Sequence, residues 1–282
     1  MNEKEFYIGW MPVAPASFSK LVKRVVIALG ILVIFIAVFL ALLQRKFSNA
    51  VFEFGTLTQV SGIYYESPYP AIKVISSSDV FGRNSYITIP LVGYGKSGAS
   101  GIIREKENAV GSSLGGKNVT LRGTLLYSDG KTLMQIDKNE EPFVSIGDPA
   151  PPGKLPVKEA LGFVTVRGEI VDPKCYFGVM KPGEGKPHKD CAIRCILGGI
   201  PPVMRVVSGG GQTNYYLLAA DSPGNIGEAV KNIIAEPVEL TARAVRQDDW
   251  VILYLKDAGD IKRISGRMLV MPDVTPVLCS VK

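Results

Sequence analysis

One short segment of the chain concentrates the residue types that bind metals or carry out redox chemistry. Three of the four cysteines and the only histidine lie between Val171 and Val203. Cys175 comes first, and His188, Cys191 and Cys195 follow as a tighter group. Thiolate sulfur and imidazole nitrogen are ligands of tetrahedral zinc, and three cysteines with one histidine form a known structural zinc site. This segment is therefore the first candidate for a functional site.

The residues around the group predict how it is presented. Pro187 precedes His188 and Gly198-Gly199 follow Leu197, and proline at the start with glycine past the end marks a helix. On a helix from His188 to Leu197, the histidine, Cys191 and Cys195 occupy positions i, i+3 and i+7, which project from one face. A Gly- and Pro-bearing loop returns Cys175 toward that face. We expect all four side chains to meet in one small site.

Four interpretations of this cluster compete. The first is a metal site for zinc or for copper, because soft sulfur ligands select cuprous ion. The second is a disulfide from Cys175 to Cys191 or Cys195, since exported cysteines are usually oxidised. The third is a thiol redox centre in which His188 or the helix N-terminus lowers the pKa of a cysteine. The fourth is an iron–sulfur cluster, which export disfavours.

The spacing of Cys191 and Cys195 adds one resemblance. This C-x₃-C pair resembles the copper-binding thiols of the assembly factors and the copper subunit of cytochrome oxidases. The resemblance covers the pair alone, and here the histidine precedes the pair instead of following it. It implies copper as one of the candidate metals, and it assigns no family.

Other polar residues near the cluster have simpler interpretations. Asp172 and Asp190 fit turn and helix-capping roles, and the basic residues around the cluster fit a solvated surface. Cys279 is expected to be an isolated thiol. With one histidine in the chain, no Ser-His-Asp arrangement can form outside the cluster. We therefore predict no independent catalytic activity, although the enzyme class stays open.

The stretch from Val25 to Leu43 contains no charged and no polar residue. About 19–20 helical residues cross a hydrocarbon core of about 30 Å, so this stretch predicts one membrane-spanning helix. A cleaved signal peptide would have a shorter apolar stretch ending in small residues. Here Gln44, Arg45 and Lys46 follow. More basic residues precede the stretch than follow it, which predicts a cytoplasmic N-terminus and a periplasmic or extracellular soluble region.

An internal duplication organises the soluble region. Residues 116–136 and 235–255 both show alternating apolar residues, a polar turn and a second apolar strand, which is a β-hairpin pattern. Upstream, Gly55 is matched with Gly168, and Tyr86 is matched with Tyr215. The repeated strand order predicts a mainly β protein with two small tandem barrels of the oligonucleotide/oligosaccharide-binding type, or two sandwiches. The second unit alone carries the helical Cys/His insertion.

These patterns define an expected organisation. It comprises a cytoplasmic segment (1–24), a transmembrane helix (25–43), a first β-barrel-like unit (47–141), a Pro-rich linker (142–158), a second such unit with the Cys/His insertion at 171–203 (159–270), and a C-terminal tail (271–282). The net charge of +6 is spread along the chain, and no basic and aromatic cluster indicates nucleic-acid binding.

Two functions from different classes fit this organisation. The first is a membrane-anchored metal-binding or redox accessory protein that acts with a membrane oxidoreductase. The second is a non-catalytic scaffold subunit whose cysteines form a structural disulfide or a structural zinc site. In both cases the expected partners are the lipid bilayer and other membrane-protein subunits.

Overall fold

The structure is a computed structural model that describes residues 16–44, 50–78, 80, 84–221, 226–256 and 258–265. The predicted C-terminal tail, Cys279 and the first fifteen residues lie outside the described residues. By its internal contacts the chain divides into residues 1–49 and residues 50–282. Each of these units is described by itself.

The described residues of the first unit, 16–44, form one helix, α1 (Ala16–Gln44). Within it, residues 18–43 are long and apolar enough to cross a membrane. The helix begins nine residues before the predicted apolar stretch, because Lys20, Lys23 and Arg24 are compatible with helix although not with a hydrocarbon core.

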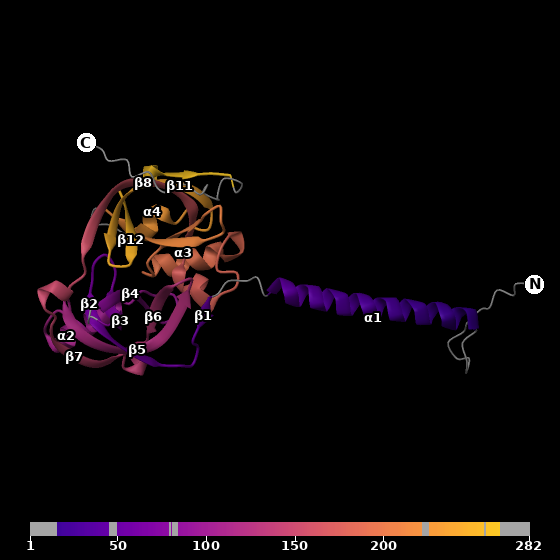
Figure 1. Ribbon diagram of the computed structural model, residues 1–282, viewed down its shortest axis with the longest axis horizontal. Coiled ribbons are helices and arrows are strands. Elements are labelled where there is room, and N and C mark those ends of the chain that lie inside the picture. The colour runs from indigo at the N-terminus through magenta and orange to yellow at the C-terminus, as the bar shows by residue number, and fades with distance from the viewer. Residues whose placement is uncertain are drawn as a thin grey trace, which may run out of the picture. The chain divides into compact units, whose positions relative to one another are not determined.

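The second unit is mainly β and contains two closed rings of strands (Figure 1). The first ring is made of β2 (Thr58–Tyr65), β3 (Ala71–Ser78), β4 (Asn84–Gly93), β5 (Lys117–Ser128) and β6 (Lys131–Ile136). It closes because β5 pairs with both β2 and β6, while β4 and β6 pair in parallel. Helix α2 (Ser100–Val110) lies between β4 and β5 in the chain. Two further strands, β1 (Val51–Phe52) and β7 (Phe143–Pro149), pair with β5.

The second ring repeats the same order. It consists of β8 (Lys158–Val171), β9 (Val203–Val207), β10 (Thr213–Ala220), β11 (Pro237–Gln247) and β12 (Trp250–Leu255), with β13 (Ile261–Arg263) added on β11. Strand β11 pairs with β8 and β12, and β10 pairs with β12 in parallel. Helix α4 (Ile226–Val230) lies between β10 and β11, as α2 does between β4 and β5. The mainly β prediction is confirmed, and tandem units of the predicted type are compatible with this topology.

The strand pairings correct the residue alignment of the duplication. Gly62, not Gly55, is the counterpart of Gly168, because Gly62 pairs with Val119 and Gly168 pairs with Val238. At both positions a Cβ atom would lie within 2.6 Å of a carbonyl oxygen on the next strand, so both copies need glycine there. The match of Tyr86 with Tyr215 is off by two residues. A shift of two leaves each side chain on the same face of its strand, so the alternating pattern does not reveal the error.

The segment expected to be a linker is extended, but part of it belongs to the fold. Residues 143–149 form β7 on the first ring, and Lys158 already starts β8. The rings are not separated by a free spacer. A shared apolar cluster joins them, with Leu126 and Leu133 from the first ring and Leu217, Trp250 and Ile252 from the second.

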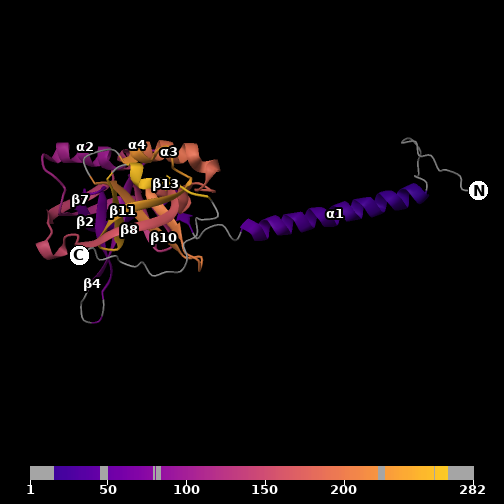
Figure 2. The same cartoon turned by 90° about the horizontal axis from the view of Figure 1, so that it is seen from above.

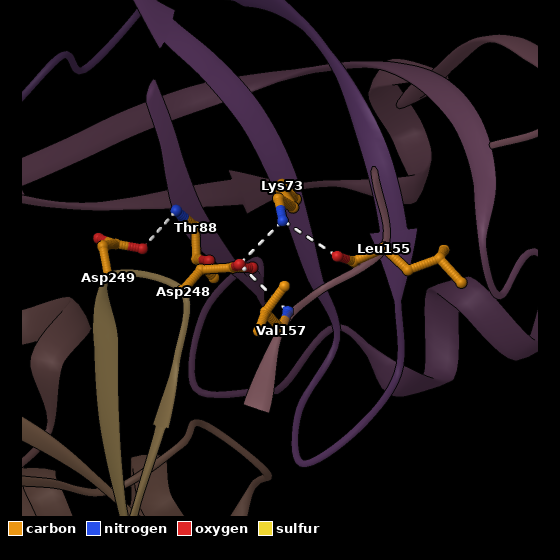
Figure 3. Close-up of polar contacts among 6 residues, drawn as sticks. All are labelled: Lys73, Thr88, Leu155, Val157, Asp248 and Asp249. Carbon is orange, nitrogen blue, oxygen red and sulfur yellow. Dashed lines mark hydrogen bonds and ion pairs between the residues drawn. The ribbon is translucent and has the colours of Figure 1, made fainter. Parts of the chain in front are cut away.

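Polar contacts add to this shared core (Figure 3). The turn between β11 and β12 points its carboxylates at strands of the first ring. Asp248 Oδ1 lies 2.8 Å from Lys73 Nζ, and Asp249 Oδ1 accepts a hydrogen bond from the Thr88 amide at 2.7 Å. The Trp250 indole donates to the Thr88 carbonyl at 3.1 Å. Asp248 and Asp249 therefore form the polar turn of the hairpin at residues 235–255, and they contribute to the interface between the rings.

Candidate metal centre

The two rings differ most in one connection. Strands β2 and β3 are joined by residues 66–70, whereas β8 and β9 are joined by residues 172–202, which carry the cysteines and the histidine. This insertion contains a π-helical turn, η3 (Cys175–Val179), a 3-10 turn, η4 (Lys186–His188), and helix α3 (Lys189–Leu197). Figure 2 shows α2, α3 and α4 along one side of the two rings. The predicted short helix is thus present, with His188 at its N-cap.

The loop before α3 returns Cys175 to the helix. The ligand atoms of Cys175, His188 and Cys191 all lie within 4.8 Å of one another, and the sulfurs of the two cysteines are 4.0 Å apart. Cys175 and His188 are buried, and Cys191 is partly exposed. Nε2 of His188 is buried and has no hydrogen-bond partner among the described residues. These three residues form a Cys/His cluster that could hold a metal ion.

Cys195 joins this cluster from another side. Its ligand atom, that of Cys175 and a carboxylate oxygen of Asp172 lie within 4.8 Å of one another. The ligand atoms of the four predicted residues are therefore not all within 4.8 Å of one another. Cys195 lies with Cys175 and Asp172, whereas His188 and Cys191 lie with Cys175 on the other side. Asp172 was expected to serve a turn, and its Oδ1 does accept the amide of Lys174 at 2.9 Å. Its Oδ2 is buried and has no hydrogen-bond partner within the described part of the chain.

The three cysteines described in the structure are free thiols. The pKa of Cys175 is raised by a hydrogen bond with Cys195, by burial and by the charge of Asp172. Burial lowers the pKa of His188, which keeps the imidazole neutral and able to coordinate. A metal ion would have to displace the thiol protons, so its affinity would rise with pH.

Two lysines reach the cluster, and neither was predicted. Lys96, in the loop after β4, donates a hydrogen bond to Cys191 Sγ at 3.1 Å. Buried Lys174 donates to the carbonyl oxygens of Gly93, at the end of β4, and of Gly95, in the same loop, both at 2.7 Å. Burial lowers the pKa of Lys174, and the charge of Asp172 opposes that shift. The centre is thus completed by the first ring, about 80 residues upstream of the insertion.

The loop after β4 and the end of α3 approach each other through glycines. A Cβ atom on Gly98 would lie 2.2 Å from the carbonyl oxygen of Gly199, and one on Gly198 would lie 1.9 Å from that of Lys96. The Gly98 amide donates to the Gly198 carbonyl at 2.8 Å. Val92 and Ile200 pack beside Cys175 and Cys195 as one small buried cluster. Any larger residue at these glycines would move the wall of the centre.

The basic residues on the insertion itself lie away from the sulfurs of the cluster or pair elsewhere. Lys181, Lys186 and Arg194 are exposed, as the solvated-surface interpretation predicted. Lys189 pairs with Glu236. The local sequence gave no signal for Lys96, because its role depends on the docking of one ring against the other.

Comparison with known proteins adds little. No family model matches the chain, and no curated protein matches it. One solved structure that matches is the crystal structure of a deletion mutant of the single-stranded DNA binding protein from Thermus aquaticus. It shares 12% sequence identity at a TM-score of 0.21, over 78% of this chain and 90% of that chain. At that TM-score the similarity carries no argument about function.

Proposed function

We propose that this protein is a membrane-anchored, extracytoplasmic metal-binding protein that serves as an accessory to a membrane oxidoreductase. One observation carries the proposal: two cysteines and a histidine from a single insertion bring their ligand atoms within 4.8 Å of one another. The insertion is built into one of two otherwise similar rings, so the rings supply a frame and the insertion supplies the chemistry.

The donor set favours a thiophilic metal. Two thiolates and one neutral imidazole suit zinc or copper, and further thiol and carboxylate groups lie next to them. Three protein ligands with one open position are typical of sites at which the metal exchanges ligands, whereas four closed ligands are typical of structural zinc. Partly exposed Cys191 gives the ion a route to solvent or to a partner protein.

The remaining parts of the proposal concern the setting. Helix α1 would span the membrane with its N-terminus in the cytoplasm, and both rings would be tandem oligonucleotide/oligosaccharide-binding-type barrels outside it. The partners would be the bilayer and other membrane-protein subunits, without nucleic acid. An alkaline phosphatase fusion after residue 49 should be active, and a cytoplasmic reporter at the same position should be silent. The opposite pattern would refute this compartment.

Metal content tests the central claim. The full chain, purified in mild detergent without chelators, should contain zinc or copper by elemental analysis. Cys191→Ser should contain less metal than the wild type, because a ligand thiolate is removed without disturbing a buried residue. Ser97→Ala, in the loop that faces Cys191, is a matched control that should keep the metal. Equal metal in both variants would contradict the proposal.

The scaffold function remains the second candidate, and one observation favours it. Cys175 and Cys191 lie 4.0 Å apart within the insertion, so a metal ion or a Cys175–Cys191 disulfide would hold the insertion in the shape that contacts the loop of the first ring. Metal exchange separates the two functions. An accessory site should exchange bound zinc or copper with a chelator while the fold persists, whereas removal of a structural metal should unfold the insertion.

A further inference from the structure

The cluster contains more ligand groups than one metal position needs. Cys175, His188 and Cys191 form one group, and Asp172, Cys175 and Cys195 form another, with Cys175 common to both. A thiolate sulfur has several lone pairs and can bond two metal ions at once. The sharing of Cys175 is therefore the arrangement that a bridged pair of metal ions requires.

Cys195 is placed as a ligand, and Asp172 is placed as a buried carboxylate beside it. Asp172 is fully buried, and Cys195 is 2% exposed. Oδ2 of Asp172 is buried and, within the described part of the chain, interacts only with the Cys175 thiol, so a metal ion that displaces the thiol proton would leave this oxygen in need of a cation or a donor. Lys174 gives the carboxylate only its backbone amide, because its ammonium group is directed to the carbonyls of Gly93 and Gly95.

We propose that Cys175 bridges two cuprous ions, the first held with His188 and Cys191 and the second with Cys195 beside the Asp172 carboxylate. This inference rests on the proposed metal-binding function. It extends that function by stating how many metal ions the centre holds and by including Asp172 in the site.

The donor atoms select the ion. Soft sulfur ligands select cuprous ion, and each position has two cysteine sulfurs when the shared Cys175 is counted in both. Structural zinc takes four ligands, and the five groups of the cluster complete only one such set. We therefore expect two cuprous ions or one zinc ion per chain.

The experiment is a stoichiometric titration of the full chain in mild detergent, without oxygen and with a reductant. Cuprous ion is added against a coloured cuprous chelator, and bound copper is counted by native mass spectrometry. Wild type should bind two. Cys195→Ser should keep the first ion and His188→Ala should keep the second, so each binds one. Cys175→Ser should bind neither, and a parallel zinc titration should end at one.

The carboxylate has its own variant and control. Asp172→Asn retains an oxygen for the Lys174 amide and removes the charge, and it should weaken the second copper by about 10–100-fold, as loss of a group supporting a metal does. Asp190→Asn makes the same change on an exposed residue of α3 and should leave both affinities unchanged. Circular dichroism shows which variants are folded, and Cys195→Ser with His188→Ala suffices if Cys175→Ser does not fold.

The outcomes separate the two proposals. Two ions in wild type with one in each single variant supports the bridge. A single ion that is lost in both Cys195→Ser and His188→Ala indicates one four-ligand site, which overturns this inference and leaves metal binding intact. Binding of neither copper nor zinc by wild type overturns both.

Discussion

Removal of the Asp248 charge should separate the two rings. Lys73 is 5% exposed, and its ammonium group lies 2.8 Å from Asp248 and 3.1 Å from the Leu155 carbonyl (Figure 3). Asp248→Asn keeps an oxygen for the Val157 amide and tolerates the positive φ of 52° at this position. It leaves the lysine buried at the interface without its counter-charge.

The expected loss of stability follows from burial. Breaking a buried ion pair by removing one partner destabilises a fold by about 3–5 kcal/mol. For a unit of this size, about 2–4 °C of melting temperature corresponds to 1 kcal/mol, so the fall should be about 6–20 °C. Lys73→Met combined with Asp248→Asn should recover at least about 2 kcal/mol, because no buried charge is then left unpaired.

Trp250 offers a direct measurement of this separation. It is 1% exposed, and its indole donates to Thr88 of the first ring. The chain has two tryptophans, so Trp10→Phe makes Trp250 the single fluorophore. Thermal unfolding of the full chain in mild detergent is followed by the red shift of Trp250 emission and, in parallel, by circular dichroism.

An exposed ion pair provides the control. Arg246 and Glu159 are 2.9 Å apart, with side chains 52% and 58% exposed, so Glu159→Gln should change stability by less than about 1 kcal/mol. If Asp248→Asn is as mild as Glu159→Gln, or if the effects of the two interface substitutions simply add, the Lys73–Asp248 pair does not hold the rings together.

Three further predictions address the same architecture. Gly98→Ala should lower both the melting temperature and the metal affinity, because its Cβ would lie 2.2 Å from a backbone oxygen. Gly101→Ala in α2 has open space around the added Cβ and should be neutral or stabilising, so equal behaviour of the two variants would refute the close contact. Trypsin cleavage at Lys154, in the short turn after β7, should leave two fragments that elute together from gel filtration, because they share an apolar cluster; fragments that elute separately would show independent barrels. Hydrogen bonds from Lys189 and Arg263 lower the pKa of Glu236, so the ionised carboxylate stabilises the fold at neutral pH and this contribution is lost as pH falls below about 4. Glu236→Gln should reduce the dependence of the unfolding free energy on pH in that range, and an unchanged dependence would contradict the pairing.

The sequence was informative wherever a local pattern determines structure. Alternation identified the hairpins, and Pro187 with Gly198-Gly199 marked the ends of the helix that carries Cys191 and Cys195. The apolar stretch within α1 was equally plain. These features depend on near neighbours in the chain, and their patterns survive without knowledge of the tertiary fold.

Features that depend on the docking of the two rings could not be predicted from the sequence. Lys96 reaches Cys191 across the junction of the two rings, and Lys174 is buried because a loop from the first ring covers it. Asp172 looked like a turn residue, which it is, and only the folded insertion places it beside Cys195. The match of Tyr86 with Tyr215 failed because a strand period of two residues leaves the register open by whole periods. The match of Gly55 failed for another reason, since Gly55 lies in the turn before β2, seven residues from Gly62.

The position of Lys96 has a consequence for biogenesis. The loop that forms the wall of the centre is synthesised first, and Lys174 and Cys191, which it contacts, follow 81 and 95 residues after their partners in that loop. Domains fold broadly in order from the N-terminus as the chain is made, so the first ring can form while the cysteines are still unshielded. Closure of the loop over Cys191 must therefore be a late event in maturation. In the proposed extracytoplasmic setting, metal binding or oxidation of the thiols would act on the nascent insertion before the two rings dock.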